Sequence, residues 1–299
     1  MKNTANKLLL VDAFSLIYRA FFAIRMLNAP DGTPVNALYG FTKMVRKLLA
    51  THAPSHGAVV FDCGPPRRRL SVLPTYKEQR PPTPPELEAQ LGGIREVLQA
   101  MRLFVAEMEG EEADDIIATL AVRAAAMRFD VLVASQDKDF CQIVGSRIRL
   151  LRPDREEMLS LGPEDVRARY GVGPEQFVDY LSLVGDAVDN IAGVPGVGPK
   201  TAANLLREHG SLEKLLERPE RIRQPKLRRA IVEAAKQLRV NQGLLRLETD
   251  LAVPWSLDEL RIVPADEPRL RELFARYGFR SLLAEKAPTR GNTELLLDL

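Results

Sequence analysis

The 299-residue sequence contains few residues that support disulfide or zinc chemistry. It has two cysteines, Cys63 and Cys141, and three histidines whose spacing matches no zinc-binding pattern. A disulfide framework and a structural zinc site are therefore excluded. We expect both cysteines to be reduced, buried thiols that pack as small apolar side chains.

The sequence also lacks long apolar runs and a marked excess of one charge. The apolar run near the N-terminus is broken by Asp12 and has no small-residue cleavage site, and no later segment approaches about 20 uninterrupted apolar residues. These absences predict a cytoplasmic protein without a membrane span. The net charge of +2 does not by itself indicate a nucleic-acid partner.

The charges that are present are distributed unevenly. Residues 107–115 contain six acids, whereas residues 67–69 and 221–229 are basic. Acids in the first turn stabilise a helix by complementing its dipole, so the acidic stretch alone is typical of an ordinary surface helix. A catalytic interpretation requires that acids from distant parts of the chain reach the same place.

Three short apolar segments predict strands that are buried on both faces, at 7–12, 56–62 and 130–137. Helical patterns lie between and beside them, at 15–24, 36–50, 85–101 and 113–126. This alternation predicts an α/β fold with a parallel central sheet flanked by helices. Each predicted strand ends in an aspartate (Asp12, Asp62 or Asp137), and ligands of such sheets bind at the carboxyl ends of the strands. We therefore expect these carboxylates in one crevice.

Residues 63–87 are rich in proline and arginine and have no sustained periodicity. They predict a long excursion above the sheet edge, although the composition is equally compatible with a disordered linker. After about residue 160 the strand signals stop and helical patterns continue. We predict a first domain at 1–165, an all-helical second domain at 166–288 and a tail at 289–299.

Nine acids follow predicted strands or helix starts: Asp12, Asp62, Glu112, Asp114, Asp115, Asp137, Asp139, Asp186 and Asp189. Two unit charges about 4 Å apart repel by about 1 kcal/mol in water and about 4 kcal/mol at an effective dielectric near 20, so cations must share such a site. Ligand sets made of oxygen alone suit Mg²⁺ or Mn²⁺. Two such ions support phosphodiester cleavage, and the pattern is also compatible with a phosphatase.

The segment GVPGVGPKTA at 193–202 indicates the substrate class. A P-loop is excluded because Pro199 stands where that motif needs lysine. Gly196, Gly198 and Pro199 instead predict a tight turn between two helices. The N–H groups at the start of the second helix, together with Lys200, would bind a phosphate without reading bases. The alternative is an ordinary helix connection.

These motifs together resemble the 5′ nuclease family, specifically the bacterial 5′-to-3′ exonuclease found at the N-terminus of DNA polymerase I and related to flap endonucleases. The matching stretches include EADD at 112–115, QDKDF at 136–140 and GDAVDNIAGVPGVGPKTA at 185–202. The resemblance implies a PIN-like nuclease core, an arch at 63–87 and a helix-hairpin-helix domain. It implies cleavage of DNA at a 5′ flap, nick or end by a monomer with two Mg²⁺ or Mn²⁺ ions.

The resemblance also implies roles for individual residues. All nine acids become metal ligands, and the catalytic residues become Asp12, Asp114, Asp137, Lys77 and Arg80. The implied DNA contacts are Arg19, Tyr39, Arg69, Tyr76, Lys77, Arg80, Gly196, Gly198, Lys200 and Thr201. Tyr76 is expected to stack on a base, and a K⁺ ion is expected at the turn.

Five positions depart from the family pattern without removing a ligand: Leu70, Ser71, Gln136, Val188 and Ala192. Two other functions stay open, a DNA-binding paralogue without activity and a PIN-type ribonuclease. The complete set of acids argues against the first, and the glycine turn argues against the second. The sequence is compatible with a free-standing nuclease and with the front of a longer polymerase.

Overall fold

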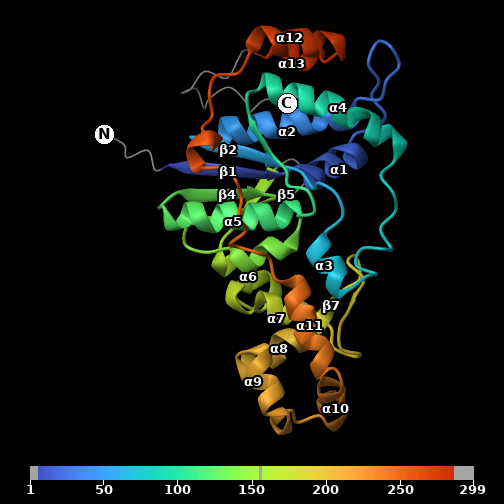
Figure 1. Ribbon diagram of the computed structural model, residues 1–299, viewed down its shortest axis with the longest axis vertical. Helices are drawn as coiled ribbons and strands as arrows, with labels where there is room; N and C mark the ends of the chain where they lie inside the picture. Colours follow the sequence, from blue (N-terminus) through green and yellow to red (C-terminus); the bar gives the residue numbers. More distant parts are fainter. Residues whose placement is uncertain (1–5, 155–156, 286–299) are drawn as a thin grey trace.

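The computed structural model describes residues 6–154 and 157–285 and contains a central sheet of six strands in the order β3-β2-β1-β4-β5-β6 (Figure 1). The strands are β1 (Lys7–Asp12), β2 (His56–Val60), β3 (Phe104–Ala106), β4 (Asp130–Ala134), β5 (Ile148–Asp154) and β6 (Glu157–Leu161). The first five are parallel, and β6 pairs with β5 in the antiparallel sense. The predicted α/β class is confirmed, but the sheet is mixed rather than wholly parallel.

Helices cover both faces of the sheet. One face carries α1 (Ala13–Ala23), α2 (Asn36–His52) and α4 (Pro85–Ala100), and the other carries α5 (Ala113–Ala126). In β1, Leu8 and Leu10 pack on the side of α5, whereas Leu9 packs on the opposite side. All three are at most 1% exposed, and each contributes about 1.5–3 kcal/mol by burial. This two-sided burial explains why the strand reads as a continuous apolar run.

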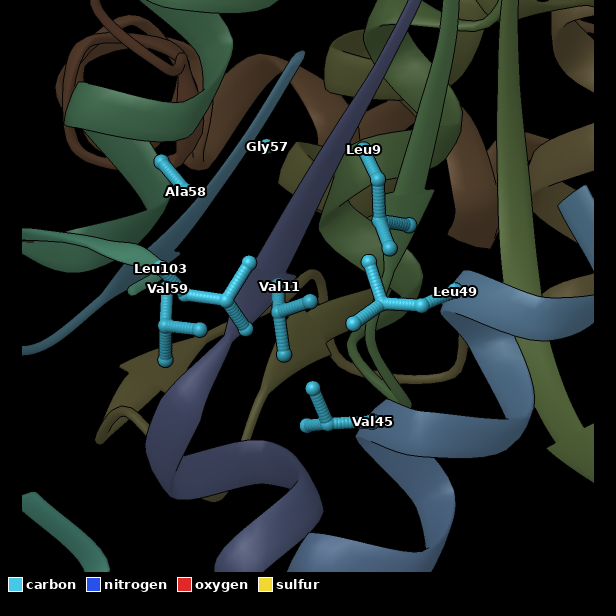
Figure 2. A pocket seen from close by; sticks show the side chains of 8 residues that line it. All are labelled: Leu9, Val11, Val45, Leu49, Gly57, Ala58, Val59 and Leu103. Carbon is cyan, nitrogen blue, oxygen red and sulfur yellow. The ribbon is translucent and has the colours of Figure 1, made fainter. Parts of the chain in front are cut away.

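The core on the α2 side is closely packed. A void of about 10 Å³ lies between β1, β2 and α2, and its apolar lining includes Leu9, Val11 and Val45 (Figure 2). A cavity of this size and character is at the lower limit for a single water molecule and offers that water no hydrogen-bonding group. Ligand binding therefore belongs to another part of the molecule.

The arch segment has more structure than its composition predicts. It contains a short helix, α3 (Arg67–Val72), followed by turns that lead to α4. Cys63, just before α3, is half-buried and donates to Glu109 Oε2 at 3.4 Å, so the expectation of two buried thiols is wrong for this residue. Cys141 is buried as expected, and both thiols are free.

The second domain lies beyond α5, on the opposite side of the sheet from α2 and α4 (Figure 1). Its helices are α6 (Pro163–Tyr170), α7 (Phe177–Val184), α8 (Pro199–His209), α9 (Leu212–Glu217), α10 (Pro225–Glu233) and α11 (Ala235–Leu245). The described residues also form four short 3₁₀ helices: η1 (Lys138–Ile143), η2 (Pro174–Gln176), η3 (Pro219–Arg221) and η4 (Leu257–Leu260). Among the described residues, none of the helices has the length and apolar character needed to cross a membrane.

A small ribbon interrupts the predicted all-helical domain. Strands β7 (Gly185–Asp186) and β8 (Ile191–Ala192) pair antiparallel between α7 and the glycine turn. Gly185 has φ +80°, and a Cβ there would lie 2.3 Å from the Gly193 nitrogen. The close approach of these two backbones therefore requires glycine, and the prediction of helix alone was wrong here.

The chain returns to the first domain after α11. Helices α12 (Glu267–Arg276) and α13 (Arg280–Ala284) lie over α4 and α2, and Leu270, Leu273 and Phe274 join the core on that side of the sheet. The predicted unit 166–288 therefore does not pack as one body, because the apolar face of α12 is buried against the first domain. The predicted tail at 289–299 lies outside the described residues.

We predict that Phe274→Ala lowers the free energy of unfolding by about 3–5 kcal/mol, because it empties a site that is 3% exposed in the core of the first domain. Chemical denaturation would measure the change. Leu159→Ala, at a side chain that is 39% exposed, is the control and should shift stability by less than about 0.5 kcal/mol. An equally small effect for Phe274→Ala would show that the returning segment does not stabilise this domain.

Candidate active site

Three aspartates follow neighbouring strands of the sheet, and each receives a nearby backbone N–H. Asp12 Oδ1 accepts from Ser15 N at 3.2 Å, Asp62 Oδ1 from Ala113 N at 2.8 Å, and Asp137 Oδ1 from Asp139 N at 2.9 Å. Asp12 thus caps α1 and Asp137 caps η1, as simple helix-start residues would. Capping does not remove their charge, so the three carboxylates still face one another across the strand ends.

The electrostatics of Asp12 reflect this crowding. Burial raises the pKa of Asp12 to about 7 from its ordinary value of 3.8, and the charges of Asp62 and Asp137 contribute in the same direction. A hydrogen bond of 2.6 Å from Ser135 Oγ to Asp12 Oδ2 opposes the rise. The three strand-end acids therefore interact, as their positions in the sequence predict.

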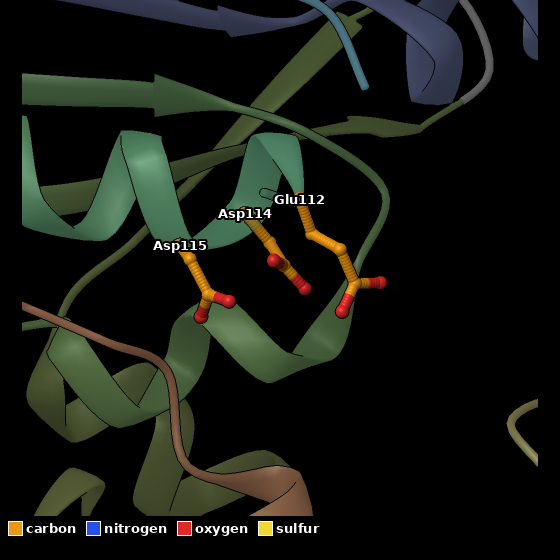
Figure 3. A group of neighbouring side chains, drawn as sticks. All are labelled: Glu112, Asp114 and Asp115. Carbon is orange, nitrogen blue, oxygen red and sulfur yellow. The ribbon is translucent and has the colours of Figure 1, made fainter. Parts of the chain in front are cut away.

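The first turn of α5 carries the next acids. Glu112 is the N-cap residue, and Asp114 and Asp115 follow it in the first turn. Their side chains project from the same side of the helix end, and single oxygens of the three lie within 4.8 Å of one another (Figure 3). Burial raises the pKa of Asp114 well above its ordinary value, although Arg69 opposes this shift.

A second acidic group gathers beside η1. Asp139, Asp186 and Asp189 are at most 9% exposed. Burial, followed by the charge of Asp137, raises the pKa of Asp139 well above its ordinary value, and the charges of Asp186 and Asp189 add to the rise. The β7–β8 loop therefore brings its two aspartates to the end of β4.

Basic side chains of the arch bridge the two acidic groups. Lys77 Nζ donates to Glu112 Oε1, and Arg80 Nη2 donates to Asp189 Oδ1 at 2.6 Å. The Lys77 backbone N–H also donates to the Asp189 carbonyl at 3.3 Å. Burial alone would raise the pKa of Glu112, but the charges of Lys77 and Arg69 outweigh it and lower that pKa. In this conformation the arch neutralises the acids directly.

Two predicted DNA contacts lie inside the site instead of on its surface. Arg69 is 3% exposed and Tyr76 is 5% exposed. The Tyr76 hydroxyl donates to Asp189 Oδ2 at 3.1 Å, so its ring is not presented to a base in this conformation. The direction of these side chains depends on how the arch folds, which its irregular sequence does not reveal.

The predicted DNA contacts other than Arg69, Tyr76, Lys77 and Arg80 lie on α1, on α2, at the glycine turn and at the start of α8. Arg19, on α1, donates to Gln136 Oε1 at 3.4 Å, and the Tyr39 hydroxyl shares a hydrogen bond of 2.9 Å with Ser281. Gly196, Gly198, Lys200 and Thr201 form a turn and the start of α8 as predicted, but the ribbon β7–β8 and not a helix directly precedes this turn. Gly196 has φ +82°, and a Cβ at either glycine would meet nothing within 4 Å. This turn therefore presents open backbone next to a helix start.

The departures from the family pattern leave the acids in place. Leu70 packs against the core, and Ser71 Oγ donates to the Arg68 carbonyl at 2.7 Å. Gln136 Nε2 donates to the Ser15 carbonyl at 3.1 Å and so joins β4 to α1. Val188 is 62% exposed, and the Ala192 carbonyl accepts from Asn241 Nδ2 at 2.8 Å.

Lys138 is a site residue that the sequence reasoning missed. Its ammonium group donates to Asp186 Oδ2 at 2.5 Å and lies 3.7 Å from Asp139 Oδ1. Burial would lower the pKa of Lys138, but Asp139 and the hydrogen bond to Asp186 raise it above its ordinary range. Its position between two predicted ligands in the sequence was the available signal.

The acids fit divalent cations on a direct observation. Asp114 Oδ1 and Asp139 Oδ1 are buried, and neither has a hydrogen-bond partner in the described part of the chain. Buried polar atoms without partners are rare in proteins and indicate an unfilled interaction. Carboxylate oxygens without competing Cys or His ligands suit hard cations such as Mg²⁺. The fold and the site thus define an α/β protein with a carboxylate centre suited to divalent metal ions.

The chain belongs to the 5′-3′ exonuclease family. Residues 7–171 match the 5′-3′ exonuclease N-terminal resolvase-like domain, and residues 172–268 match the 5′-3′ exonuclease C-terminal SAM fold. A 5′-3′ exonuclease of Aquifex aeolicus is 37% identical over 279 residues, which cover 93% of this chain and 94% of that protein.

Longer relatives carry the name DNA polymerase I. The protein of Bacillus caldotenax is 40% identical over 280 residues, which cover 93% of this chain and 32% of the relative. That of Thermus thermophilus is 39% identical over 94% of this chain and 33% of the relative. The chain therefore spans about a third of the length of these relatives.

Solved structures support the fold. A bacteriophage T5 5′-exonuclease described with bound zinc ions has a TM-score of 0.68 and 22% identity, covering 91% of this chain and all of that one. The catalytic core of Rad2 in complex with DNA substrate has a TM-score of 0.61 and 17% identity, covering 94% of this chain and 91% of that one. At these identities the likeness concerns the fold.

We predict that Asp12→Asn stabilises the metal-free protein at pH 8. The folded-state pKa of Asp12 is raised from 3.8 to about 7, so its contribution to stability is fully present below pH 3.8 and is lost as pH rises through about 7. Asparagine removes the buried charge and hence this loss.

The measurement is the free energy of unfolding in excess chelator from pH 4 to pH 8. The gain from Asp12→Asn should grow with pH across this window. Asp258→Asn, at a side chain that is 90% exposed, should leave the pH dependence unchanged. A gain for Asp12→Asn that is independent of pH would contradict the assignment.

Proposed function

We propose that this protein is a Mg²⁺-dependent, structure-specific 5′ nuclease. It hydrolyses a DNA phosphodiester near the junction of a 5′ single strand and a duplex, as a cytoplasmic monomer in DNA replication and repair. The observation that carries the proposal is the pair of buried carboxylate oxygens, on Asp114 and Asp139, that accept no hydrogen bond from the described residues. Membership of the 5′-3′ exonuclease family supports the choice of substrate.

Two groups of acids would hold the metal ions. The first comprises Glu112 and Asp114 together with Asp12 and Asp62, and the second comprises Asp137, Asp139, Asp186 and Asp189. When bound, two Mg²⁺ or Mn²⁺ ions activate an attacking water and neutralise charge on the scissile phosphate. Carboxylates that repel one another in the metal-free protein become mutually compatible ligands.

The arch residues Lys77 and Arg80 would act on the scissile phosphate. In this structure Lys77 pairs with Glu112, and Arg80 pairs with Asp189. Once these acids are neutralised by metal, the ammonium and guanidinium groups become available to a phosphate in the same space. There they would stabilise the negative charge that develops as the bond breaks.

The glycine turn would hold duplex DNA away from the reacting bond. Gly198 is the N-cap of α8 and offers no side-chain cap, so the first N–H groups of the helix have no partner within it. With Lys200 beside them, they suit a backbone phosphate. A K⁺ ion bound by carbonyl groups of the turn would complete this contact.

We predict that chelator abolishes cleavage of a labelled 5′-flap DNA and that Mg²⁺ or Mn²⁺ restores it. Asp114→Asn should lower kcat by more than about 100-fold, because loss of a ligand costs more than loss of the outer partners that alter metal sites by about 10–100-fold. DNA affinity in Ca²⁺ should change little.

Glu164→Gln is the control, since that side chain is 83% exposed on α6. Single-turnover cleavage and DNA binding would be measured for each variant. Full cleavage in excess chelator would eliminate the metal-dependent mechanism, and ordinary turnover of Asp114→Asn would remove that residue from the site.

We predict that the arch and the turn separate turnover from binding. Lys77→Ala should lower turnover more than affinity, because the charge acts mainly in the transition state. Lys200→Ala should weaken affinity for all sequences and reduce the slope of log affinity against log salt by about 1, with turnover at saturation little changed.

A salt titration of affinity beside single-turnover cleavage would measure both variants. The opposite pattern, in which Lys77→Ala loses affinity alone and Lys200→Ala loses turnover alone, would place the scissile phosphate at the turn rather than beneath the arch.

A further inference from the structure

Asp115 differs from Asp114 in that both of its carboxylate oxygens accept hydrogen bonds, two of them from the two prongs of one guanidinium group. Oδ1 accepts from Arg69 Nη2 at 3.0 Å and from the Glu248 backbone N–H at 2.8 Å, and Oδ2 accepts from Arg69 Nη1 at 2.6 Å. The residue is 1% exposed. Asp114, one position earlier, has a buried oxygen without a hydrogen-bond partner among the described residues. Adjacent acids in one motif therefore have opposite bonding states.

Arg69, in helix α3 of the arch, contacts residues of both α5 and α11. Its Nε donates to the Leu244 carbonyl at 2.9 Å, and its Nη1 also donates to Glu112 Oε2. One guanidinium thus contacts α5 through Asp115 and Glu112 and the end of α11 through Leu244. Three segments that are far apart in the sequence meet at this side chain.

Arg68 strengthens the junction on the same side of α11. Its Nη1 donates to the Gly243 carbonyl at 3.1 Å, and its Nη2 donates to the Arg246 carbonyl at 3.3 Å. A salt bridge of 2.9 Å joins it to Glu248 Oε1. Two consecutive arginines therefore fasten α3 to the end of a helix, where carbonyl groups favour positive charge.

Metal binding by Asp115 would require this arrangement to break. A buried, two-pronged arginine–carboxylate pair is among the strongest charged contacts, and removing one partner leaves an uncompensated charge in the interior. Asp115 would have to give up both prongs of its Arg69 pair and the Glu248 N–H, whereas Asp114 Oδ1 and Asp139 Oδ1 accept no hydrogen bond from the described residues and have only ion pairs of 3.7 Å, with Arg69 and Lys138. The chemistry of Asp115 does not fit a ligand.

We infer that Asp115 is a positioning residue rather than a metal ligand. With Arg69, the Leu244 carbonyl and the Glu248 N–H, it forms an interdomain clamp that fixes the arch and the end of α11 to the first turn of α5. Through Arg69 the clamp also orients Glu112. The inference rests on the proposed nuclease function for its consequence in catalysis, but the bonding of Asp115 can be tested without DNA.

The first experiment counts bound Mn²⁺ ions by electron paramagnetic resonance in the absence of DNA. Asp114→Asn should bind one ion fewer than the unaltered protein at the same Mn²⁺ concentration. Asp115→Asn should bind the full number at saturating Mn²⁺, with affinity weakened by about 10–100-fold, as loss of the outer partners of metal sites does. Loss of an ion by Asp115→Asn equal to that of Asp114→Asn, with the fold intact by circular dichroism, would overturn the inference.

A second variant keeps the test decisive if Asp115→Asn does not fold. Arg69→Lys keeps the positive charge but removes the fork that contacts Asp115 and Leu244 together. It should retain the full Mn²⁺ count and increase proteolytic cleavage within residues 73–84 several-fold. Unchanged proteolysis of the arch would show that no clamp is holding it. Glu107→Gln, an exposed acid in the same acidic stretch that pairs with Arg95 of α4, is the control for both measurements.

Kinetics then distinguish the clamp from a purely structural role. Arg69→Lys should lower single-turnover cleavage of a 5′-flap substrate several-fold while the Mn²⁺ count stays the same. Cleavage at the unaltered rate by a variant with a loosened arch would refute the link to Glu112. If the unaltered protein cleaves no DNA substrate, the proposed function fails, whereas the ion count and the proteolysis still decide the role of Asp115.

Discussion

Repulsion among buried carboxylates is the constraint on which the rest of this structure depends. Charges about 4 Å apart repel by about 4 kcal/mol at an effective dielectric near 20, and a domain is stable by only about 5–15 kcal/mol. The protein offsets this repulsion with Lys77, Arg80, Arg69 and Lys138, all of which contact the acids. At Asp114 and Asp139 the nearest cations, Arg69 and Lys138, are 3.7 Å away, and burial still raises the pKa of each acid. The arch, the β7–β8 loop and the start of α5 are arranged to satisfy this balance.

The elements that the sequence predicted best are those whose local pattern and tertiary role agree. Strands β1, β2 and β4 are continuous apolar runs because both faces are covered, and α1, α2 and α4 have one apolar face each, whereas α5 is buried round most of its surface. The sequence analysis did not predict β3, which has three residues, β5, in which Arg149 and Arg152 interrupt the apolar run, or β6, whose outward side chains are polar or exposed. None of these segments carries a periodic signal long enough to recognise.

The sequence predicted which acids lie near one another, but it did not predict which groups contact each carboxylate oxygen. Parallel topology alone places Asp12, Asp62 and Asp137 at one edge of the sheet. Nothing in the sequence distinguishes Asp115 from Asp114. The oxygens of Asp115 accept hydrogen bonds from Arg69 and the Glu248 N–H, whereas Asp114 Oδ1 accepts none from the described residues. The inward orientation of Arg69 and Tyr76 was equally hidden, because it follows from the path of the arch across the site. The residue type shows that a carboxylate is present, whereas the hydrogen-bond partners of each carboxylate oxygen come from segments that are distant in the sequence.

The return of the chain onto α4 has a consequence for biosynthesis. The first domain is discontinuous, since its core combines residues before α6 with Leu270, Leu273 and Phe274. The helical unit between them is contiguous and leaves the ribosome before α12 does. Domains fold as units during synthesis, in order of emergence. The helices between α6 and α11 can therefore reach their final packing before α12 and α13 have been synthesised and packed onto the first domain.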